Sequence, residues 1–367
     1  MDKQTQRRFL GVLLVTVFLG GMWSGGSEAQ APLRKTTVIY PSTGFGVATA
    51  PLSSLPKALG YFQEEGLDVH FAGVAGSQPA LQMVLSGNGD VAAMQPITLF
   101  QMRPKGARAK AFYTWVRHNW FYPVVIEGSP IKSLKDFKGK TIGVSGMGAS
   151  MIPFMKLVVG DAGLDPERDV TFVSAGGGAG AAALLAQGKV DVLGLWSAQY
   201  AAMANAGFKL HAFVDVNPIK SMSFAVTYAA TDEWLRDNPK VAVGLGRSWA
   251  RATLFAMTNP EATVRHHWAL YPQSKPTGVD EATAMRGALN ELKDTLSFMR
   301  IDNATVKKWG MTTGKEIKDY AEVLQRAKLI EGDPGKLDDY FTAEFIDAIN
   351  AFDEKKVIEQ ARAYKVQ

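Results

Sequence analysis

The segment Met83-Val-Leu-Ser-Gly-Asn-Gly-Asp-Val-Ala-Ala-Met94 has a counterpart 101 residues later, Leu184-Leu-Ala-Gln-Gly-Lys-Val-Asp-Val-Leu-Gly-Leu195. In each copy an apolar helical run ends at a glycine, Gly87 or Gly188, and a strand opens three residues further on at an aspartate. Any two such units share this outline, but here three successive units match in order. The repeat therefore predicts a chain built from two lobes of one design.

Strands and helices alternate around both copies. In the first copy, Thr37-Val-Ile-Tyr40 and Leu67-Asp-Val-His-Phe71 have strand patterns, with a helical run between them. In the second copy, Lys140-Thr-Ile-Gly-Val144 and Val170-Thr-Phe-Val173 repeat that order. Strands separated by helices of this length favour an α/β fold, with a parallel, two-sided sheet in each lobe.

The rest of the chain, from Thr231 onward, has mainly helical patterns, including one over residues 291–299. We expect these helices to pack on the first lobe. The chain would then cross between the lobes twice. Two apolar, β-rich stretches, 122–128 and 221–228, suit a pair of crossover hinge strands. The predicted organisation is a signal peptide over residues 1–29, a first lobe over 35–126 and 224–367, and a second lobe over 127–223.

The first 29 residues have the three parts of a secretory signal peptide. Basic residues precede an apolar run over Phe9–Met22, and small residues stand at Ser27 and Ala29, after which cleavage is expected. The run is short for a membrane span, although an uncleaved anchor is the alternative. Arg7-Arg8 leaves general and twin-arginine export both open. The chain has no cysteine, which excludes a lipid anchor and disulfides, so we expect a soluble protein in a Gram-negative periplasm.

Composition and motifs argue against several classes of function. The formal net charge is only +5 and the basic residues are scattered, which gives no sign of nucleic-acid binding. No histidine stands at metal-ligand spacing from another, and we expect all five to be surface or capping residues. Gly176-Gly-Gly-Ala-Gly180 meets the dinucleotide fingerprint only in a looser form, and phosphate-loop and nucleophile-elbow motifs are missing. We therefore expect a binding protein without metal or cofactor, not an enzyme.

The carboxyl ends of the predicted strands indicate where a ligand would bind, because ligands of open α/β sheets lie outside those ends. The repeat makes Gln95 and Trp196 equivalent, facing each other across a cleft. Glycine-rich loops that begin helices would turn free N–H groups toward an anionic or strongly polar group. Arg117 is the best candidate for a counter-charge. The predicted ligand-binding residues are Ser42, Thr43, Gly44, Phe45, Ser77, Gln78, Gln95, Met147, Gly148, Ser150, Gly177, Gly178, Trp196 and Arg117.

Each of these residues also has a structural interpretation. Ser77 and Ser150 can serve as helix caps, and the glycines can serve turn geometry alone. Trp196 can belong to the core of its lobe, and Arg117 can lie on a solvated rim. Because no Lys or Arg occurs in the six strand-end loops, a neutral or aromatic ligand also stays open.

Several segments resemble the nitrate, sulfonate and taurine type of periplasmic binding protein, a group related in fold to the thiamine-pyrimidine synthases. The longest are Ala58-Leu-Gly-Tyr-Phe-Gln-Glu-Glu-Gly-Leu-Asp-Val69 and Ser129-Pro-Ile-Lys-Ser-Leu-Lys-Asp-Phe-Lys-Gly-Lys-Thr-Ile-Gly-Val144, and the others are 76–78, 87–91 and 187–192. The resemblance implies a two-lobed, type II-like clamshell with two crossover strands, which delivers its ligand to an inner-membrane ABC permease. The synthases depend on a cysteine-rich segment, so the lack of cysteine excludes that enzymatic branch.

The expected function is that of a monomeric periplasmic substrate-binding protein of an ABC importer. Its lobes would close on a small organic solute, sulfonate-like or carboxylate. A periplasmic protein that reports its ligand to a membrane receptor is the alternative, because sequence does not separate the two roles. A secreted enzyme on the same fold is a third interpretation, for which Arg117 and His118 are the only hint of chemistry.

Overall fold

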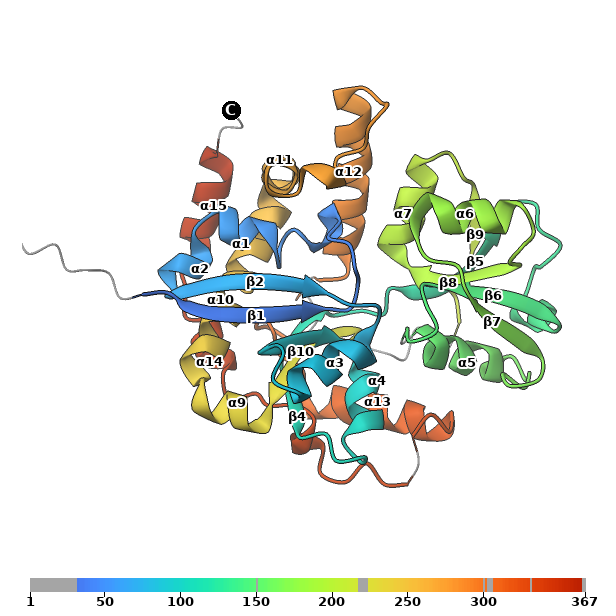
Figure 1. Cartoon of the computed structure of the whole chain (residues 1–367), viewed down its shortest axis with the longest axis horizontal. Coiled ribbons are helices and arrows are strands. Elements are labelled where there is room, and N and C mark those ends of the chain that lie inside the picture. The colour runs from blue at the N-terminus through green and yellow to red at the C-terminus, as the bar shows by residue number, and fades with distance from the viewer. Residues whose placement is uncertain are drawn as a thin grey trace, which may run out of the picture. The chain divides into compact units, whose positions relative to one another are not determined.

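The computed structural model describes residues 32–149, 151–216, 224–299, 301, 306–330 and 332–364. Two five-stranded sheets organise this part of the chain (Figure 1), and each sheet with its helices is called a lobe below. The strand order of the first sheet is β2 (Leu67–Gly73), β1 (Arg34–Tyr40), β3 (Val91–Met94), β10 (Val226–Thr231) and β4 (Ala109–Val116). The strand order of the second sheet is β7 (Val170–Ser174), β6 (Lys140–Val144), β8 (Val192–Trp196), β5 (Phe121–Ile126) and β9 (Leu210–Ala212).

The two sheets share one topology, which confirms the predicted repeat. β1 pairs in parallel with β2 and β3, and β6 pairs in parallel with β7 and β8. The two repeated aspartates make one equivalent contact. The backbone N–H of Thr37 donates to the Asp90 carboxylate at 2.7 Å, and that of Thr141 donates to the Asp191 carboxylate at 2.8 Å. Each aspartate therefore ties the third strand of its repeat to the first.

Neither sheet is fully parallel, which corrects the sequence prediction. β5 runs antiparallel to β8 and β9, and β10 runs antiparallel to β3 and β4. Phe121 opens β5 and pairs with Trp196, the last residue of β8. The chain thus enters the second lobe at the edge where the parallel strands end, and the entering strand must run against them. β10 enters the first lobe in the same way, since Thr227 pairs with Met94.

The chain crosses between the sheets at residues 117–120, and again between Ala212 and Val226, where residues 217–223 lie outside the described part. The two β-rich stretches expected at the crossings contribute strands to different sheets, since β5 belongs to the second sheet and β10 to the first. Residues 121–126, expected in the first lobe, therefore lie in the second sheet. The other lobe boundaries stay predictions.

Short helices follow the strands of each repeat, and two of them begin directly at strand ends. Gln95 and Trp196 immediately precede α4 and α7, so both residues sit at the carboxyl end of a strand and at the start of a helix. The helices of the first lobe are η1 (Val47–Thr49), α1 (Ser54–Ala58), α2 (Tyr61–Glu64), α3 (Ser77–Leu85) and α4 (Pro96–Met102). Those of the second lobe are η2 (Leu134–Phe137), α5 (Met151–Asp161), α6 (Gly178–Ala186) and α7 (Ser197–Asn205).

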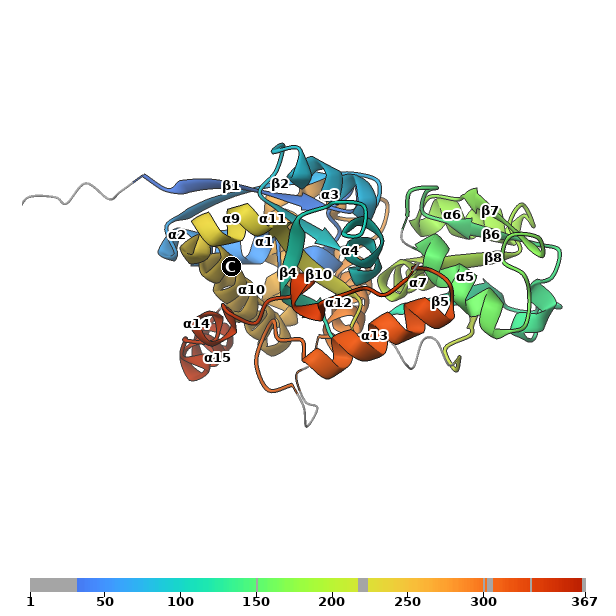
Figure 2. The same cartoon turned by 90° about the horizontal axis from the view of Figure 1, so that it is seen from below.

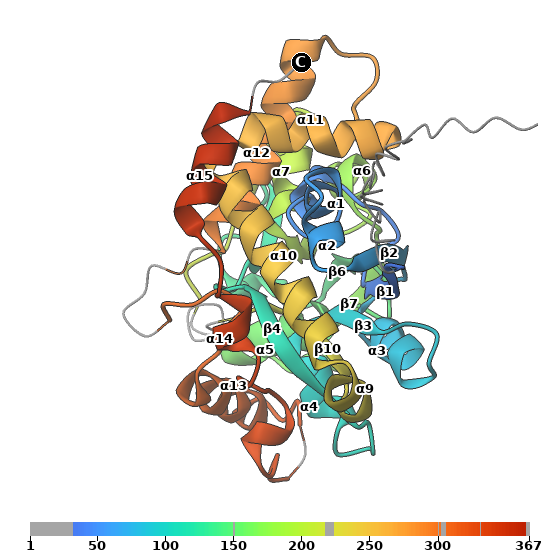
Figure 3. The ribbon, with the colours of Figure 1, turned by 90° about the vertical axis from the view of Figure 1, so that its left-hand side faces the viewer.

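The tail forms a helical layer that packs mainly on the first lobe. Its elements are α9 (Asp232–Asp237), α10 (Pro239–Thr258), α11 (Pro260–Leu270), η3 (Pro272–Ser274), α12 (Glu281–Ser297), α13 (Gly314–Arg326), η4 (Leu337–Asp339), α14 (Ile346–Ile349) and α15 (Glu354–Ala363). The long helix α10 contacts α2 and α15 (Figure 3). Figures 1 and 2 place α13 beside α4, where Phe100 stacks on Tyr320 with ring centroids 5.8 Å apart. None of the helices in the described ranges has the length and apolar character that a membrane crossing requires.

One tail helix has a second partner. α12 contacts η1 in the first lobe and also packs against α7 in the second lobe. At this contact the Asn205 side-chain amide donates to the Gly287 carbonyl at 2.9 Å. The tail therefore does more than pad the first lobe, as it was expected to do.

Candidate ligand-binding site

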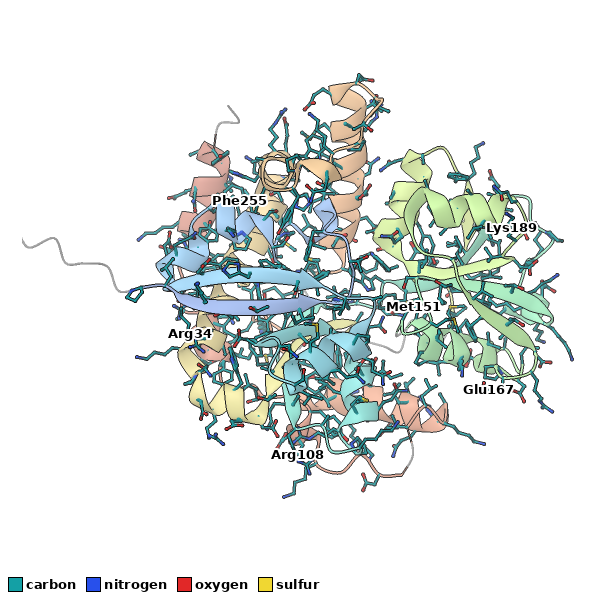
Figure 4. The ribbon with its side chains drawn as sticks, in the orientation of Figure 1. Arg34, Arg108, Met151, Glu167, Lys189 and Phe255 are labelled. Carbon is teal, nitrogen blue, oxygen red and sulfur yellow. The ribbon has the colours of Figure 1, made fainter. Side chains whose placement is uncertain are left out.

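The carboxyl ends of strands from both sheets open onto a cavity of about 130 Å³. Gln95 lines it at the end of β3, Trp196 at the end of β8 and Met151 at the start of α5. Figure 4 shows Met151 where the two lobes meet. The other lining residues are Tyr40, Pro41, Ser42, Gly44, Gly46, Ala48, Thr49, Gly76, Ser77, Met94, Trp115, Trp120, Phe121, Ser145, Ala149, Ala198, Gln199, Val226 and Glu291. Both lobes and the tail helix α12 thus form its wall.

Gln95 and Trp196 line the same cavity from the two lobes. The Gln95 backbone N–H donates to the Ser77 hydroxyl at 3.1 Å, which joins the end of β3 to the start of α3. The Gln95 side-chain amide donates to Met151 Sδ at 3.9 Å, a contact between the lobes. A molecule in this cavity would therefore touch equivalent positions of the two repeats.

The structure places seven of the predicted ligand-binding residues on this cavity or on a hollow of about 180 Å³ beside it. Ser42 and Trp196 line both spaces. The seven residues are Ser42, Thr43, Gly44, Ser77, Gln95, Gly177 and Trp196. Neither space is lined by Phe45, Gln78, Met147, Gly148, Gly178 or Arg117, and Ser150 lies outside the described residues.

Arg117 is a buried structural residue, which corrects its expected role as a counter-charge for the ligand. Its guanidinium donates to the Glu316 carboxylate at 2.5 Å and to the Met311 carbonyl at 2.6 Å, and the residue is only 1% exposed. Burial lowers the pKa of Arg117, and the Glu316 carboxylate opposes that shift. The charge of Arg117 is therefore balanced inside the fold and is not offered to the cavity.

Phe45 anchors its loop and does not face the ligand space, which corrects its expected role as a flat binding surface. Its ring stacks on Tyr271 with centroids 5.6 Å apart, and its carbonyl lies 3.0 Å from His267 Nε2. Because a carbonyl only accepts, His267 carries its proton on Nε2, and Nδ1 accepts from the Ser54 hydroxyl at 2.8 Å. Burial lowers the pKa of His267 to about 4. This fully buried, neutral histidine corrects the expectation of a surface or capping residue.

Gly148 contacts the first lobe at the rim of the cavity. A Cβ on Gly76 would collide with the Gly148 carbonyl, and the φ of 116° at Gly76 is one that glycine alone adopts readily. The backbones of the two lobes therefore touch at this point. Neighbouring Met147 is 61% exposed, and the Gln78 amide lies 3.7 Å from Met102 Sδ, so neither side chain lines the cavity as predicted.

Three helix starts around the cavity, those of α4, α6 and α7, offer fewer N–H groups than expected. The Gly178 N–H donates to the Gln199 side-chain oxygen at 2.6 Å, and the Ser197 N–H donates to the Trp120 carbonyl at 3.0 Å. Pro96 begins α4 and has no N–H to offer. Groups that are already bonded inside the fold do not solvate an anion, so these three helix starts favour an anionic ligand less than expected.

Glu291 is a cavity residue that the sequence analysis missed. Burial raises its pKa to about 7, and the Asn205 amide nearby opposes the shift. The helix over 291–299 was expected only as padding, because an amphipathic pattern does not reveal which lobe covers its faces. In the structure α12 begins at Glu281 and packs on α7.

The described residues contain no group of three or more His, Cys, Asp or Glu that could hold a metal ion.

Indole rings form much of the apolar wall. Trp115 and Trp120 meet edge to face, with centroids 6.1 Å apart and planes at 84°. The Nε1–H groups of both rings are buried and have no hydrogen-bond partner among the described residues. A buried donor without a partner costs free energy.

Sequence comparison identifies the family. A family model described as NMT1/THI5 like matches residues 55–263, more than half of the chain. The chain belongs to the NMT1/THI5-like family. This membership agrees with the resemblance found in the sequence, which is thereby confirmed. No curated protein matches this NMT1/THI5-like chain in sequence.

Solved structures with low sequence identity share the fold of this NMT1/THI5-like protein. A protein of Bordetella bronchiseptica RB50 is 20% identical, with a TM-score of 0.66 over 89% of this chain and 98% of its own. The alkanesulfonate-binding protein SsuA of Xanthomonas axonopodis pv. citri, bound to MOPS, is 16% identical, with a TM-score of 0.60 over 81% and 94%. A Candida albicans gene product with the generic periplasmic binding protein fold is 13% identical, with a TM-score of 0.62 over 85% and 97%. The predicted two-lobed α/β fold is confirmed.

Proposed function

We propose that this protein is a periplasmic solute-binding protein, which captures a small organic molecule between its lobes and delivers it to an inner-membrane ABC permease. The observation that carries the proposal is the cavity lined from both sheets at the carboxyl ends of their strands. Family membership and the fold shared with the alkanesulfonate-binding protein SsuA support it. The signal-peptide pattern over residues 1–29 supports a periplasmic location.

Closure of the lobes would couple binding to delivery. A molecule that contacts Gln95 and Trp196 together gains both contacts only when the lobes are close, so it shifts the population toward the closed form. The two crossings supply the connections about which the lobes would move. The permease would then recognise the closed form of the protein.

A thermal-shift screen of the purified protein tests this proposal. Alkanesulfonates, aromatic carboxylates, aromatic amines and pyrimidines cover the charges and shapes that the cavity could take. A compound that binds only the folded state raises the melting temperature, and we expect at least one class to do so. The proposal is wrong if no class raises it and none makes the protein more compact in small-angle X-ray scattering.

Trp196→Ala should weaken binding of a compound found in the screen by about ten- to a hundredfold, because it removes a flat apolar face from the cavity. Gln95→Ala should cost about three- to tenfold, the effect of one hydrogen-bonding amide. Isothermal titration calorimetry measures both. Met147→Ala, at an exposed position outside the cavity, is the matched control and should bind like the wild type. Wild-type affinity in both cavity variants would remove these residues from the site.

Gly76→Ala should hinder closure, because its Cβ would meet the Gly148 carbonyl. We expect about tenfold weaker binding or more, and a larger radius of gyration with ligand present than the wild type has. Gly87→Ala controls for backbone strain alone, since Gly87 has a φ of 76° and no atom within 4 Å of the added carbon. If Gly76→Ala binds and compacts normally, the contact with Gly148 does not belong to the ligand-bound form.

A further inference from the structure

The ionisable groups of the cavity restrict the charge of its ligand. Among the described residues that line the cavity and the hollow beside it, none is Lys, Arg or His. The lining contains one acid, Glu291, and one tyrosine, Tyr40. Burial raises the pKa of Tyr40 far above its usual range, so its hydroxyl stays neutral. A bound anion would therefore meet a carboxylate and no compensating positive charge from these described lining residues.

The Glu291 carboxylate has no ion-pair partner among the described residues. Burial is the main influence on its pKa, and only the neutral Asn205 amide acts in the opposite direction. Burying a carboxylate without a counter-ion is unfavourable, and such groups concentrate at functional sites. A positively charged ligand atom beside Glu291 would supply the missing partner.

At three of the helix starts near the cavity, those of α4, α6 and α7, the first N–H group is missing or already bonded. The N–H groups of Gly178 and Ser197 are bonded within the protein, and Pro96 has none. An anion would have to break those two bonds before it could use these N–H groups. A cation has no such requirement.

The apolar wall fits a flat ring. Trp115, Trp120 and Trp196 contribute indole rings, whose faces attract cations. The cavity volume of about 130 Å³ is close to that of an apolar protein cavity of about 150 Å³ that holds benzene. A single ring with a small substituent therefore suits the space.

We propose, on the basis of the solute-binding function above, that the cavity takes a small single-ring aromatic or heteroaromatic cation. Its ammonium group or protonated ring nitrogen lies against Glu291, and its ring lies among Trp115, Trp120 and Trp196. This assignment gives the solute the charge opposite to the one expected from the sequence.

Four probes that share one ring test the assignment by calorimetric titration of the purified protein. They are benzylamine, which is a cation, benzyl alcohol, which is neutral, and the anions benzoate and benzenesulfonate. At pH 8 benzylamine is charged and Glu291, with a pKa of about 7, is largely ionised. We expect the cation to bind about tenfold tighter than the alcohol, and both anions to bind more weakly than the alcohol.

Glu291→Gln separates the charge from the shape of the site. We expect it to weaken benzylamine binding by about tenfold and to change the affinity for benzyl alcohol by less than about threefold. The variant should melt no lower than the wild type, because the amide removes a charge that burial disfavours. Asp294→Asn is the matched control. Asp294 is a second acid on α12 whose pKa burial raises, but it does not line the cavity, so its variant should keep the preference for the cation.

The possible outcomes distinguish this inference from the proposed function. Tighter binding of either anion than of benzylamine overturns the cationic assignment and leaves solute binding intact. A preference for benzylamine that survives Glu291→Gln also overturns it. If none of the four probes binds while another class raises the melting temperature in the screen, the ligand class is wrong and the function stands. If no compound binds at all, the proposed function fails as well.

Discussion

Arg117→Ala is expected to lower the free energy of unfolding by about 3–5 kcal/mol, the cost of breaking a buried ion pair by removing one partner. The substitution leaves the Glu316 carboxylate buried without its counter-ion, and it removes the donor that the Met311 carbonyl uses at 2.6 Å. Arg117 also lies on the first crossing, and its backbone N–H donates to the Phe298 carbonyl at 2.7 Å. The same residue therefore joins the crossing to the tail, and its loss should destabilise the whole first lobe.

Urea unfolding followed by circular dichroism measures this effect, with Arg108→Ala as the matched control. Arg108 is an exposed arginine of the same lobe, labelled in Figure 4, and its substitution should change stability by less than about 0.5 kcal/mol. A double variant, Arg117→Met with Glu316→Leu, should recover much of the loss, because it removes both buried charges together. Equal stability of the Arg117 and Arg108 variants would show that the ion pair between Arg117 and Glu316 contributes nothing to the free energy of unfolding.

His267→Ala is expected to lower the free energy of unfolding by about 2–4 kcal/mol, because it opens a cavity and leaves two buried polar groups without a partner. Those groups are the Ser54 hydroxyl and the Phe45 carbonyl. Phe45 belongs to the loop that carries Ser42 and Gly44 to the cavity. The variant should therefore also weaken ligand binding, although His267 itself does not line the cavity.

The pH dependence of stability provides a second readout of His267. Its pKa is lowered from 6.5 to about 4 in the folded protein, so the unfolded chain binds a proton more readily. The stability associated with the neutral ring is fully present above pH 6.5 and decreases as the pH falls toward 4, by about 3 kcal/mol in total. His267→Ala should reduce that slope. An unchanged slope in the His267 variant would mean that the ring is not held neutral by burial.

The sequence alone determined the repeated α/β units and the edge at which they form a site. The glycine of each repeated segment ends a helix and the aspartate precedes a strand, and helix ends and strand starts are set largely by local patterns. The equivalence of Gln95 and Trp196 follows from the same register, because carboxyl ends of neighbouring parallel strands lie at one edge of a sheet.

Only the tertiary structure decided which side chains reach that edge. The direction of β5 and β10 depends on where the crossings enter each lobe, and the roles of Arg117 and Glu291 depend on partners nearly 200 and nearly 90 residues away, Glu316 and Asn205. An arginine that follows a strand looks the same in sequence whether its side chain faces solvent, a ligand or another protein side chain. The same is true of a glutamate on an amphipathic helix. Their charge state and function come from burial and pairing, which arise only when distant parts of the chain pack together.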